Sequence, residues 1–287
     1  MRVSVIITSG STALNAHVRI NCLWKCVNAM HKNPGHSFEL ILVDNSSTES
    51  HRRAIQEIAE TYKTVTHVVQ NRLNEFAGGG YRQGVKLADG DIIVTAADDV
   101  LPAEYWLSVL IAPIVEFPMR KYIGALQKGS SVKARRRGTI NVAQTGGTDL
   151  PIEYYEMSRA GAYLWAAPRQ AYDKTHHWGR AHFADTRLCQ AWMSDGWLFT
   201  IPATGDWLRH TNLNYLRPWD YTKEKRQNAY LNKWEYLDEV WGSGTVSTRE
   251  AWVPKVDYPL KNPVRIGPGS YSEEFLAKAE ELKRLDV

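Results

Sequence analysis

The sequence predicts an α/β fold in which a mostly parallel sheet is covered by helices on both faces. β-branched apolar runs alternate with helical patterns through the first half of the chain. These runs are apolar at nearly every position, which is typical of parallel strands buried on both sides. Three of the runs end in polar residues, namely Thr8, Asp44 and the pair Asp98 and Asp99. Ligands of such sheets bind beyond the carboxyl ends of the strands, so we expect these side chains to line one crevice.

Strand–helix units account for the first 117 residues. The helical stretches carry apolar residues three and four positions apart,. A polar cluster, NSST (45–48), can cap the second helix, and Pro102 suits the first turn of the fourth,. The glycines at 78–80 are expected before the third helix, which is short and ends near residue 88. The expected strands are 3–8, 38–44, 65–70 and 91–97, and the other expected helices are 13–31, 49–62 and 102–117.

The second half of the chain is less regular. The segment KGSSVKARRRGTI (128–140) predicts an exposed basic loop, and aromatic residues recur on one helical stripe within 222–241,. We therefore expect a main domain at 1–215 and a C-terminal, aromatic-rich helical extension at 216–287. Further expected elements are a buried strand at 162–168, a helix at 183–197 ended by Gly196, and a strand at 197–202,.

Composition narrows the class of protein. The chain has 287 residues, 44% of them hydrophobic, so it can bury a core without disulfides or a structural metal,. A net charge of +4 weakly favours an anionic ligand and is poor support for a dedicated nucleic-acid binder,. The three cysteines, Cys22, Cys26 and Cys189, are predicted to be core thiols,. No apolar run is long enough for a signal peptide or a transmembrane helix, so a soluble, cytoplasmic protein is expected.

The adjacent carboxylates of Asp98 and Asp99 raise an electrostatic question. Like charges this close repel, so a positive partner is expected beside them. Carboxylates in a crevice suit Mg²⁺ or Mn²⁺, which prefer oxygen ligands and commonly bridge phosphates. Asp44 could accept hydrogen bonds from a base or ribose, so the crevice would hold a nucleoside diphosphate. The alternative is a simple turn, with Asp99 capping a helix near Pro102.

A dinucleotide-binding Rossmann fold is the first rival. The glycines of GGGYRQG (78–84) do not have G-x-G-x-x-G spacing, and they follow the third strand instead of the first,. The first strand–helix junction, ITSGSTALN (7–15), lacks the fingerprint as well. No Walker A sequence is present. The sequence therefore disfavours an NAD enzyme.

Five segments together resemble a known family. VSVIIT, LILVDNSS, NRLNEFAGGG, ADGDIIVTAADD and FADTRLCQAWMSDGW occur in the order and spacing of inverting nucleotide-sugar glycosyltransferases of family two. The resemblance covers roughly residues 1–212. It implies the GT-A fold, a Rossmann-like, mostly parallel sheet with helices on both faces.

The resemblance also implies roles for five residues. Asp44 would recognise the nucleobase, and Thr8 would lie near the same base. Asn74 would border the nucleotide, although a plain loop residue is an equal alternative. Asp98 would bind the ribose, and Asp99 would bind the metal, Mn²⁺ or Mg²⁺.

Two further positions follow the family pattern with departures. Asp185 takes the place of the catalytic base, but Ala184 stands where a first acid is often found, and Ala97 likewise precedes the acidic pair. An ordinary helix cap is the alternative reading of Asp185. His210 would complete the metal site, or else be a plain buried or surface histidine, and Arg209 could contact phosphate.

These roles imply metal-dependent transfer of a sugar from a nucleoside-diphosphate donor to an acceptor hydroxyl, with inversion. A UDP-sugar is the expected donor, and the acceptor could be a glycan, a protein or a modified nucleic-acid base. The basic segment KARRR (133–137) could contact acceptor phosphates or be a solvated loop. One rival is a sugar nucleotidyltransferase-like enzyme, although its glycine- and lysine-rich opening is absent. The other is a nucleotide- or carbohydrate-binding module without activity, which Ala184 keeps open.

Overall fold

The computed structural model describes residues 1–11, 16–45, 47–72, 75–126, 135–144, 149–157, 160, 164–172, 184–203 and 207–210. Its centre is a nine-stranded sheet with the strand order β3-β2-β1-β4-β9-β6-β10-β8-β7. The first four strands in that order are parallel. They are β1 (Val3–Ser9), β2 (Glu39–Asp44), β3 (Val65–Gln70) and β4 (Ile92–Ala97), which confirms the predicted positions to within one residue at each end.

The other half of the sheet is mixed. Two of its strands, β9 and β8, run antiparallel to their neighbours, whereas β6 and β10 are parallel to each other. The predicted strands at 162–168 and 197–202 are β9 (Leu164–Pro168) and β10 (Leu198–Pro202). The prediction missed β6 (Tyr122–Ala125), β8 (Asp149–Met157) and β7 (Arg135–Ala143). An exposed loop over 128–140 was therefore wrong from residue 135 onward, because that part pairs with β8.

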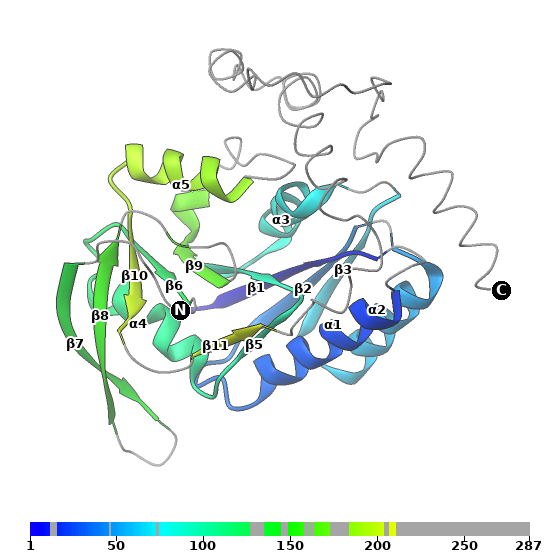
Figure 1. Cartoon of the computed structure of the whole chain (residues 1–287), viewed down its shortest axis with the longest axis horizontal. Helices are drawn as coiled ribbons and strands as arrows, with labels where there is room; N and C mark the ends of the chain where they lie inside the picture. Colours follow the sequence, from blue (N-terminus) through cyan, green and yellow to red (C-terminus); the bar gives the residue numbers. More distant parts are fainter. Residues whose placement is uncertain are drawn as a thin grey trace.

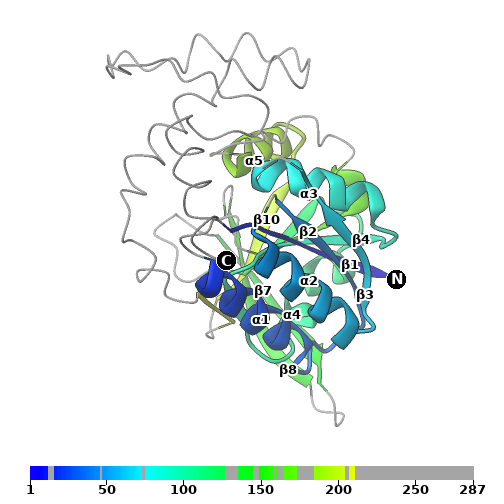
Figure 2. The same cartoon turned by 90° about the vertical axis from the view of Figure 1, so that its right-hand side faces the viewer.

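Helices cover both faces of the sheet, which confirms the predicted fold class (Figures 1 and 2). Alternate residues of β1 separate the two cores, because Val3, Val5 and Ile7 pack on one side and Ile6 on the other,. The helices of the first side are α1 (Ala16–His31), α2 (Glu49–Thr61) and α4 (Trp106–Glu116), and those of the second are α3 (Phe76–Leu87) and α5 (Ala184–Ser194).

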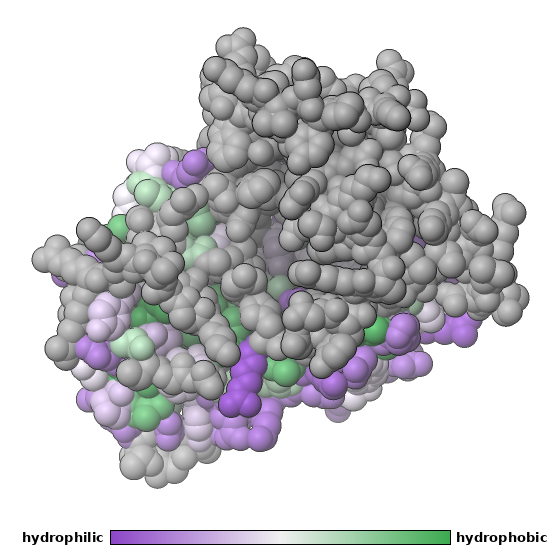
Figure 3. All heavy atoms as spheres, viewed as in Figure 1, coloured by the Kyte–Doolittle hydropathy of each residue, from purple (hydrophilic) through white to green (hydrophobic). Residues whose placement is uncertain are grey.

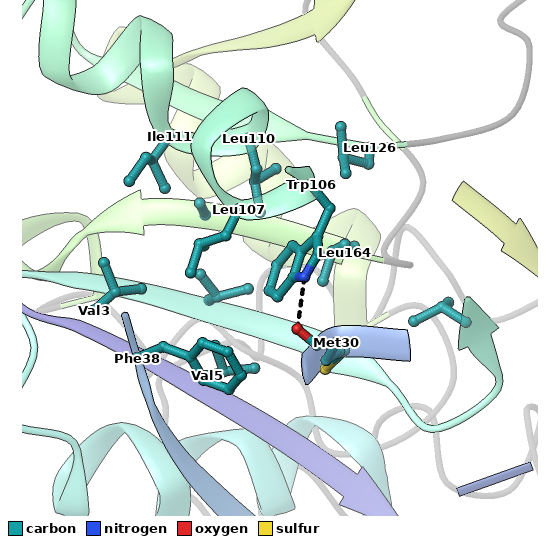
Figure 4. Packing of buried hydrophobic residues seen from close by; sticks show 14 of the residues in the cluster. Val3, Val5, Met30, Phe38, Trp106, Leu107, Leu110, Ile111, Leu126 and Leu164 are labelled. Carbon is teal, nitrogen blue, oxygen red and sulfur yellow. Dashed lines mark hydrogen bonds between the residues drawn. The ribbon is translucent and has the colours of Figure 1, made fainter. Parts of the chain in front are cut away.

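The first core is anchored by Trp106 at the start of α4. Its indole ring is fully buried, and Nε1 donates a hydrogen bond of 3.0 Å to the carbonyl oxygen of Met30 (Figure 4). Phe38 meets the same ring edge-on, with 6.1 Å between the ring centroids. The hydrogen bond between Trp106 and Met30 joins the end of α1 to the start of α4, and both helices pack on the same face of the sheet.

The fourth helix begins four residues later than predicted. Pro102 is not in its first turn but ends β5 (Val100–Pro102), which pairs antiparallel with β11 (Leu208–His210). The alternative in which Asp99 caps this helix is therefore wrong. Pro102 predicts a helix start from its immediate neighbours alone. The strand that pairs with β5, β11, lies about a hundred residues further along the chain.

Hydrophilic side chains gather on the molecular surface over α1 and α2 (Figure 3). Lys25 on α1 and Glu57 on α2 are among the exposed residues of these helices. All three cysteines are buried thiols, as predicted. Among the described residues, no helix is both long enough and apolar enough to span a membrane.

The glycines at 78–80 lie inside α3, not before it, so this part of the prediction was wrong. Gly80 and Gly84 face β1, and α3 approaches the strand so closely that side chains would collide. A Cβ atom on Gly84 would lie 2.3 Å from Cγ2 of Ile6, and one on Gly80 would lie 2.5 Å from Cγ2 of Thr8. Glycine usually disfavours a helix, but here close packing on the sheet overrides that preference.

Gly84→Ala should therefore lower the free energy of unfolding, by about 1–3 kcal/mol. Helix propensity alone predicts the opposite sign, a gain of about 1 kcal/mol. Urea unfolding measures the difference. In an Ile6→Ala background the same change should cost much less, because the clashing methyl group is gone. A stabilised Gly84→Ala protein would contradict the close packing of α3 on β1.

Candidate functional site

The predicted polar residues meet at the carboxyl edge of the parallel strands. Thr8 on β1 pairs in register with Val43 on one side and with Ala97 on the other. Ser9 pairs with Asp44, the last residue of β2. Asp98 and Asp99 follow β4 directly. The structure thus brings together the three strand ends that the sequence singled out.

Asp98 has the positive partner that the sequence demanded. Its carboxylate is 3% exposed, and it forms an ion pair with the guanidinium of Arg19 from α1. Arg19 also donates from Nε to the carbonyl oxygen of Gly10, at 3.3 Å. Burial by itself would lower the pKa of Arg19, but the carboxylates of Asp98 and Asp99 raise it above its ordinary value,. The guanidinium is therefore charged and neutralises part of the acidic pair.

The second carboxylate oxygen of Asp98 accepts a hydrogen bond from the Ser9 hydroxyl. That hydroxyl lies 2.9 Å from Nε2 of His51, a fully buried residue on α2. An ionised carboxylate can only accept, so Ser9 donates to Asp98 and accepts from His51 Nε2–H. Burial lowers the pKa of His51, although Asp98 and Asp44 act in the opposite direction,. The imidazole is therefore neutral, and its lone pair is on Nδ1.

Asp44 is completely buried at the start of α2. One carboxylate oxygen accepts the backbone N–H of Ser47 at 3.0 Å, and the other accepts from Nε of Arg52 at 3.3 Å. Thr48 caps α2 through its side-chain oxygen, which accepts from the backbone N–H of His51. This confirms the capping role predicted for the polar cluster at 45–48. The cap fixes the position of the first turn of α2. From this turn Arg52 bonds Asp44, and His51 is linked through Ser9 to Asp98.

Thr8 faces the opposite side of the sheet, where it contacts Gly80 of α3. Its Oγ1 is buried and makes no hydrogen bond to any residue that the structure describes. Thr8 thus ends β1 at this edge, but its side chain points to the face covered by α3, whereas Ser9 and Asp44 pair in register on the other face.

The backbones of the two predicted metal residues lie near each other. β5 begins directly after Asp99, and its first residue, Val100, pairs with His210 in β11. Arg209 pairs with Leu101. Asp99 is partly exposed, in contrast to the buried Asp98. No cluster of three or more His, Cys, Asp or Glu side chains occurs in the described part of the chain, so a metal here would need further ligands from its substrate or from water.

Asp185 is the second residue of α5, which confirms a helix at this place. α5 is joined by a short turn at Gly196 (φ 80°) to β10, which is parallel to β6. α5 has 11 residues and is therefore about 16 Å long, and Asp185 lies at the end of the helix that is remote from β10,. Asn74 lies outside the described residues, as does the extension predicted at 216–287.

Sequence reasoning missed the residues that hold the carboxylates, namely Ser9, Arg19, His51 and Arg52. It also missed an amide cluster nearby, in which Asn71 bonds Asn45 at 3.0 Å and Gln83 at 2.8 Å. One signal was available. His51 stands on the apolar stripe of α2, four residues before Ile55, and a polar residue on a buried face needs a partner,.

A parallel sheet with carboxylates gathered at its carboxyl edge is typical of nucleotide-binding α/β proteins. Residues 11–181 match the family model described as Glycosyl transferase family 2, and the chain belongs to that family. No curated protein matches it by sequence.

Solved structures share the GT-A fold. The 1–349 portion of TarS from S. aureus is 14% identical, with a TM-score of 0.50, over 74% of this chain and 61% of that one. GalNAc-T7, solved with UDP, GalNAc and Mn²⁺, is 16% identical, with a TM-score of 0.51, over 73% of this chain and 44% of that one. This chain therefore spans less than two thirds of either protein, and at such identity the likeness concerns the fold.

Proposed function

We propose that the protein is a glycosyltransferase that moves a sugar from a nucleoside-diphosphate donor, with UDP as the nucleotide, to an acceptor hydroxyl. The convergence of Thr8, Asp44, Asp98 and Asp99 at one sheet edge carries the proposal. Family membership supports it. The TarS and GalNAc-T7 structures that contain UDP add support for the choice of nucleotide.

The nucleoside would lie across the ends of β1, β2 and β4. Asp44 would accept hydrogen bonds from the base, and Thr8, at the end of the neighbouring strand β1, would lie near the same base. A carboxylate has about four lone-pair sites. Ser9 and Arg19 occupy two of those on Asp98, so Asp98 retains capacity to accept from a ribose hydroxyl.

The diphosphate would lie over Asp99. The carboxylate of Asp99 suits a divalent cation, and His210, which pairs with the next residue Val100, would be a further ligand beside phosphate oxygens and water,. When bound, Mn²⁺ or Mg²⁺ supplies Lewis-acid stabilisation of negative charge on the diphosphate. Arg209 would add positive charge on the same strand.

Asp185 would act as the general base. It would take the proton from the acceptor hydroxyl while that oxygen attacks the anomeric carbon. Attack on the face opposite the diphosphate inverts the configuration at that carbon. The acceptor is proposed to be a glycan, a protein side chain or a modified nucleic-acid base, with the arginines of KARRR (133–137) available for acceptor phosphates.

Thermal unfolding with UDP-, GDP-, dTDP- and CMP-sugars tests the proposal, with and without Mn²⁺. We expect metal-dependent stabilisation by a UDP-sugar, because a ligand at 100 times its Kd adds about 2.7 kcal/mol to the folded state. Release of free sugar over hours would then separate an enzyme from a binding module. Absence of stabilisation by every nucleotide would reject the proposed function.

Asp99→Asn should remove the Mn²⁺-dependent part of this stabilisation while the protein stays folded. Asp89→Asn is the matched control, because it removes the same charge from an exposed residue that precedes β4, at the opposite edge of the sheet. The measurement is the shift in Tm on addition of Mn²⁺ with a fixed UDP-sugar concentration. Equal metal dependence in both variants would contradict a metal role for Asp99.

A further inference from the structure

The first turn of α2 is linked by hydrogen bonds to both carboxylates that are proposed to bind the nucleoside. His51 reaches Asp98 through the Ser9 hydroxyl, whereas the next residue, Arg52, bonds Asp44 directly at 3.3 Å. Asp98 and Asp44 follow different strands, β4 and β2, and β1 lies between them. One helical turn therefore connects the carboxylates of Asp98 and Asp44, which follow two strands that are not neighbours in the sheet.

His51 has no other evident task in the part of the chain that the structure describes. It is fully buried, and its Nδ1 makes no hydrogen bond there, so Nε2 alone gives the ring its polar contact. An apolar side chain would avoid the cost of burying Nδ1. Retaining an imidazole at this position is consistent with a need for the N–H that Ser9 accepts.

The direction of the hydrogen bonds shows what that N–H does. A serine hydroxyl can rotate freely, and it has one proton to donate. Because His51 donates to Ser9, the hydroxyl proton is left to point at Asp98. Arg19 holds the other oxygen of the same carboxylate. The carboxylate plane of Asp98 is thereby fixed from two sides.

We propose that His51 is a positioning residue for the donor nucleotide, which acts through Ser9 to orient Asp98 toward the ribose. The inference rests on the proposed function, because it needs a nucleoside at this edge. His51 itself touches neither the ribose nor the base. Replacing His51 should therefore weaken recognition of the ribose hydroxyls in particular, instead of weakening nucleotide binding uniformly.

The test compares the affinity of UDP with that of its 2′-deoxy and 3′-deoxy analogues by calorimetry. Wild type should bind UDP about tenfold or more tightly than at least one analogue, since one hydrogen bond to a charged group is worth roughly that factor. His51→Phe should reduce this ratio to about threefold or less. His51→Gln, which keeps an N–H near the Nε2 position, should restore it.

Two further variants keep the test decisive. Ser9→Ala breaks the same link and should lose the same discrimination, even where His51→Phe fails to fold. Arg53→Ala is the control on the same helix, because its side chain is 74% exposed, and it should match wild type. Full discrimination in both Ser9→Ala and His51→Phe, or none in wild type, would overturn the positioning role alone. Failure of wild type to bind UDP would instead reject the proposed function.

Discussion

Asp185→Asn should lower kcat for sugar transfer by about 10²–10⁴-fold, with little change in donor affinity. Asparagine has the shape of aspartate but cannot accept the acceptor proton. In the first turn of α5 the lost charge should cost at most about 1 kcal/mol of stability,. Single-turnover rates at saturating acceptor, together with donor affinity, separate the chemical step from binding.

Asp195→Asn provides the matched control for this variant. Asp195 follows the last turn of the same helix and binds Lys121 through its backbone oxygen, which the substitution leaves unchanged. Its kcat should stay within about twofold of wild type, because Asp195 lies just beyond the opposite end of α5 from Asp185,. A folded Asp185→Asn protein with normal kcat would show that the base is another residue, while leaving the assignments of Asp44 and Asp98 intact.

The parallel half of the sheet was predictable because its signals are local. β1, β2 and β4 are apolar at nearly every position, and β1, β2 and β3 are each followed directly by a helix. The strands that escaped prediction depend on distant partners. β5 has three residues and is defined by β11, and the arginine-rich start of β7 becomes a strand only because β8 pairs with it. Charge in Arg135 and Arg136 predicted a loop, but tertiary pairing overrode that preference.

The site was predictable in its carboxylates but not in what surrounds them. A carboxylate after an apolar strand stands out in a sequence, so Asp44, Asp98 and Asp99 could be found. Their partners are set by packing between elements. Arg19 lies 79 residues before Asp98, and Ser9 lies 42 residues before His51. No spacing rule links such pairs, although the demand for a positive group beside Asp98 followed from charge repulsion alone.

The structure also separates the tasks of the two adjacent acids. Asp98 is buried and already neutralised by Arg19, whereas Asp99 is partly exposed. A carboxylate whose charge is balanced internally suits hydrogen bonding to a neutral hydroxyl. One that is partly exposed suits a cation. The guanidinium of Arg19 thus lowers the repulsion between Asp98 and Asp99 before any metal binds.

Arg19→Met should lower the free energy of unfolding by about 3 kcal/mol, because it leaves the carboxylate of Asp98 buried without its countercharge. The guanidinium is itself 19% exposed, so water can enter and the loss should lie toward the lower end of the range for buried pairs,. Guanidinium chloride unfolding gives the value. Lys25→Met, an exposed residue on the same helix, should change stability by no more than about 0.5 kcal/mol,.

The double variant Arg19→Met with Asp98→Asn tests whether the loss of stability in Arg19→Met comes from the unbalanced charge of Asp98. Asparagine removes the buried charge but can still accept from Ser9, so the double variant should regain much of the stability that Arg19→Met loses,. Additive losses would instead show that Arg19 stabilises α1 through packing of its aliphatic stem. Recovery of stability without recovery of UDP binding would separate the two tasks of Asp98. The charge of Asp98 would then lower the stability of the fold unless Arg19 balances it, and the same charge would be needed to bind the ribose.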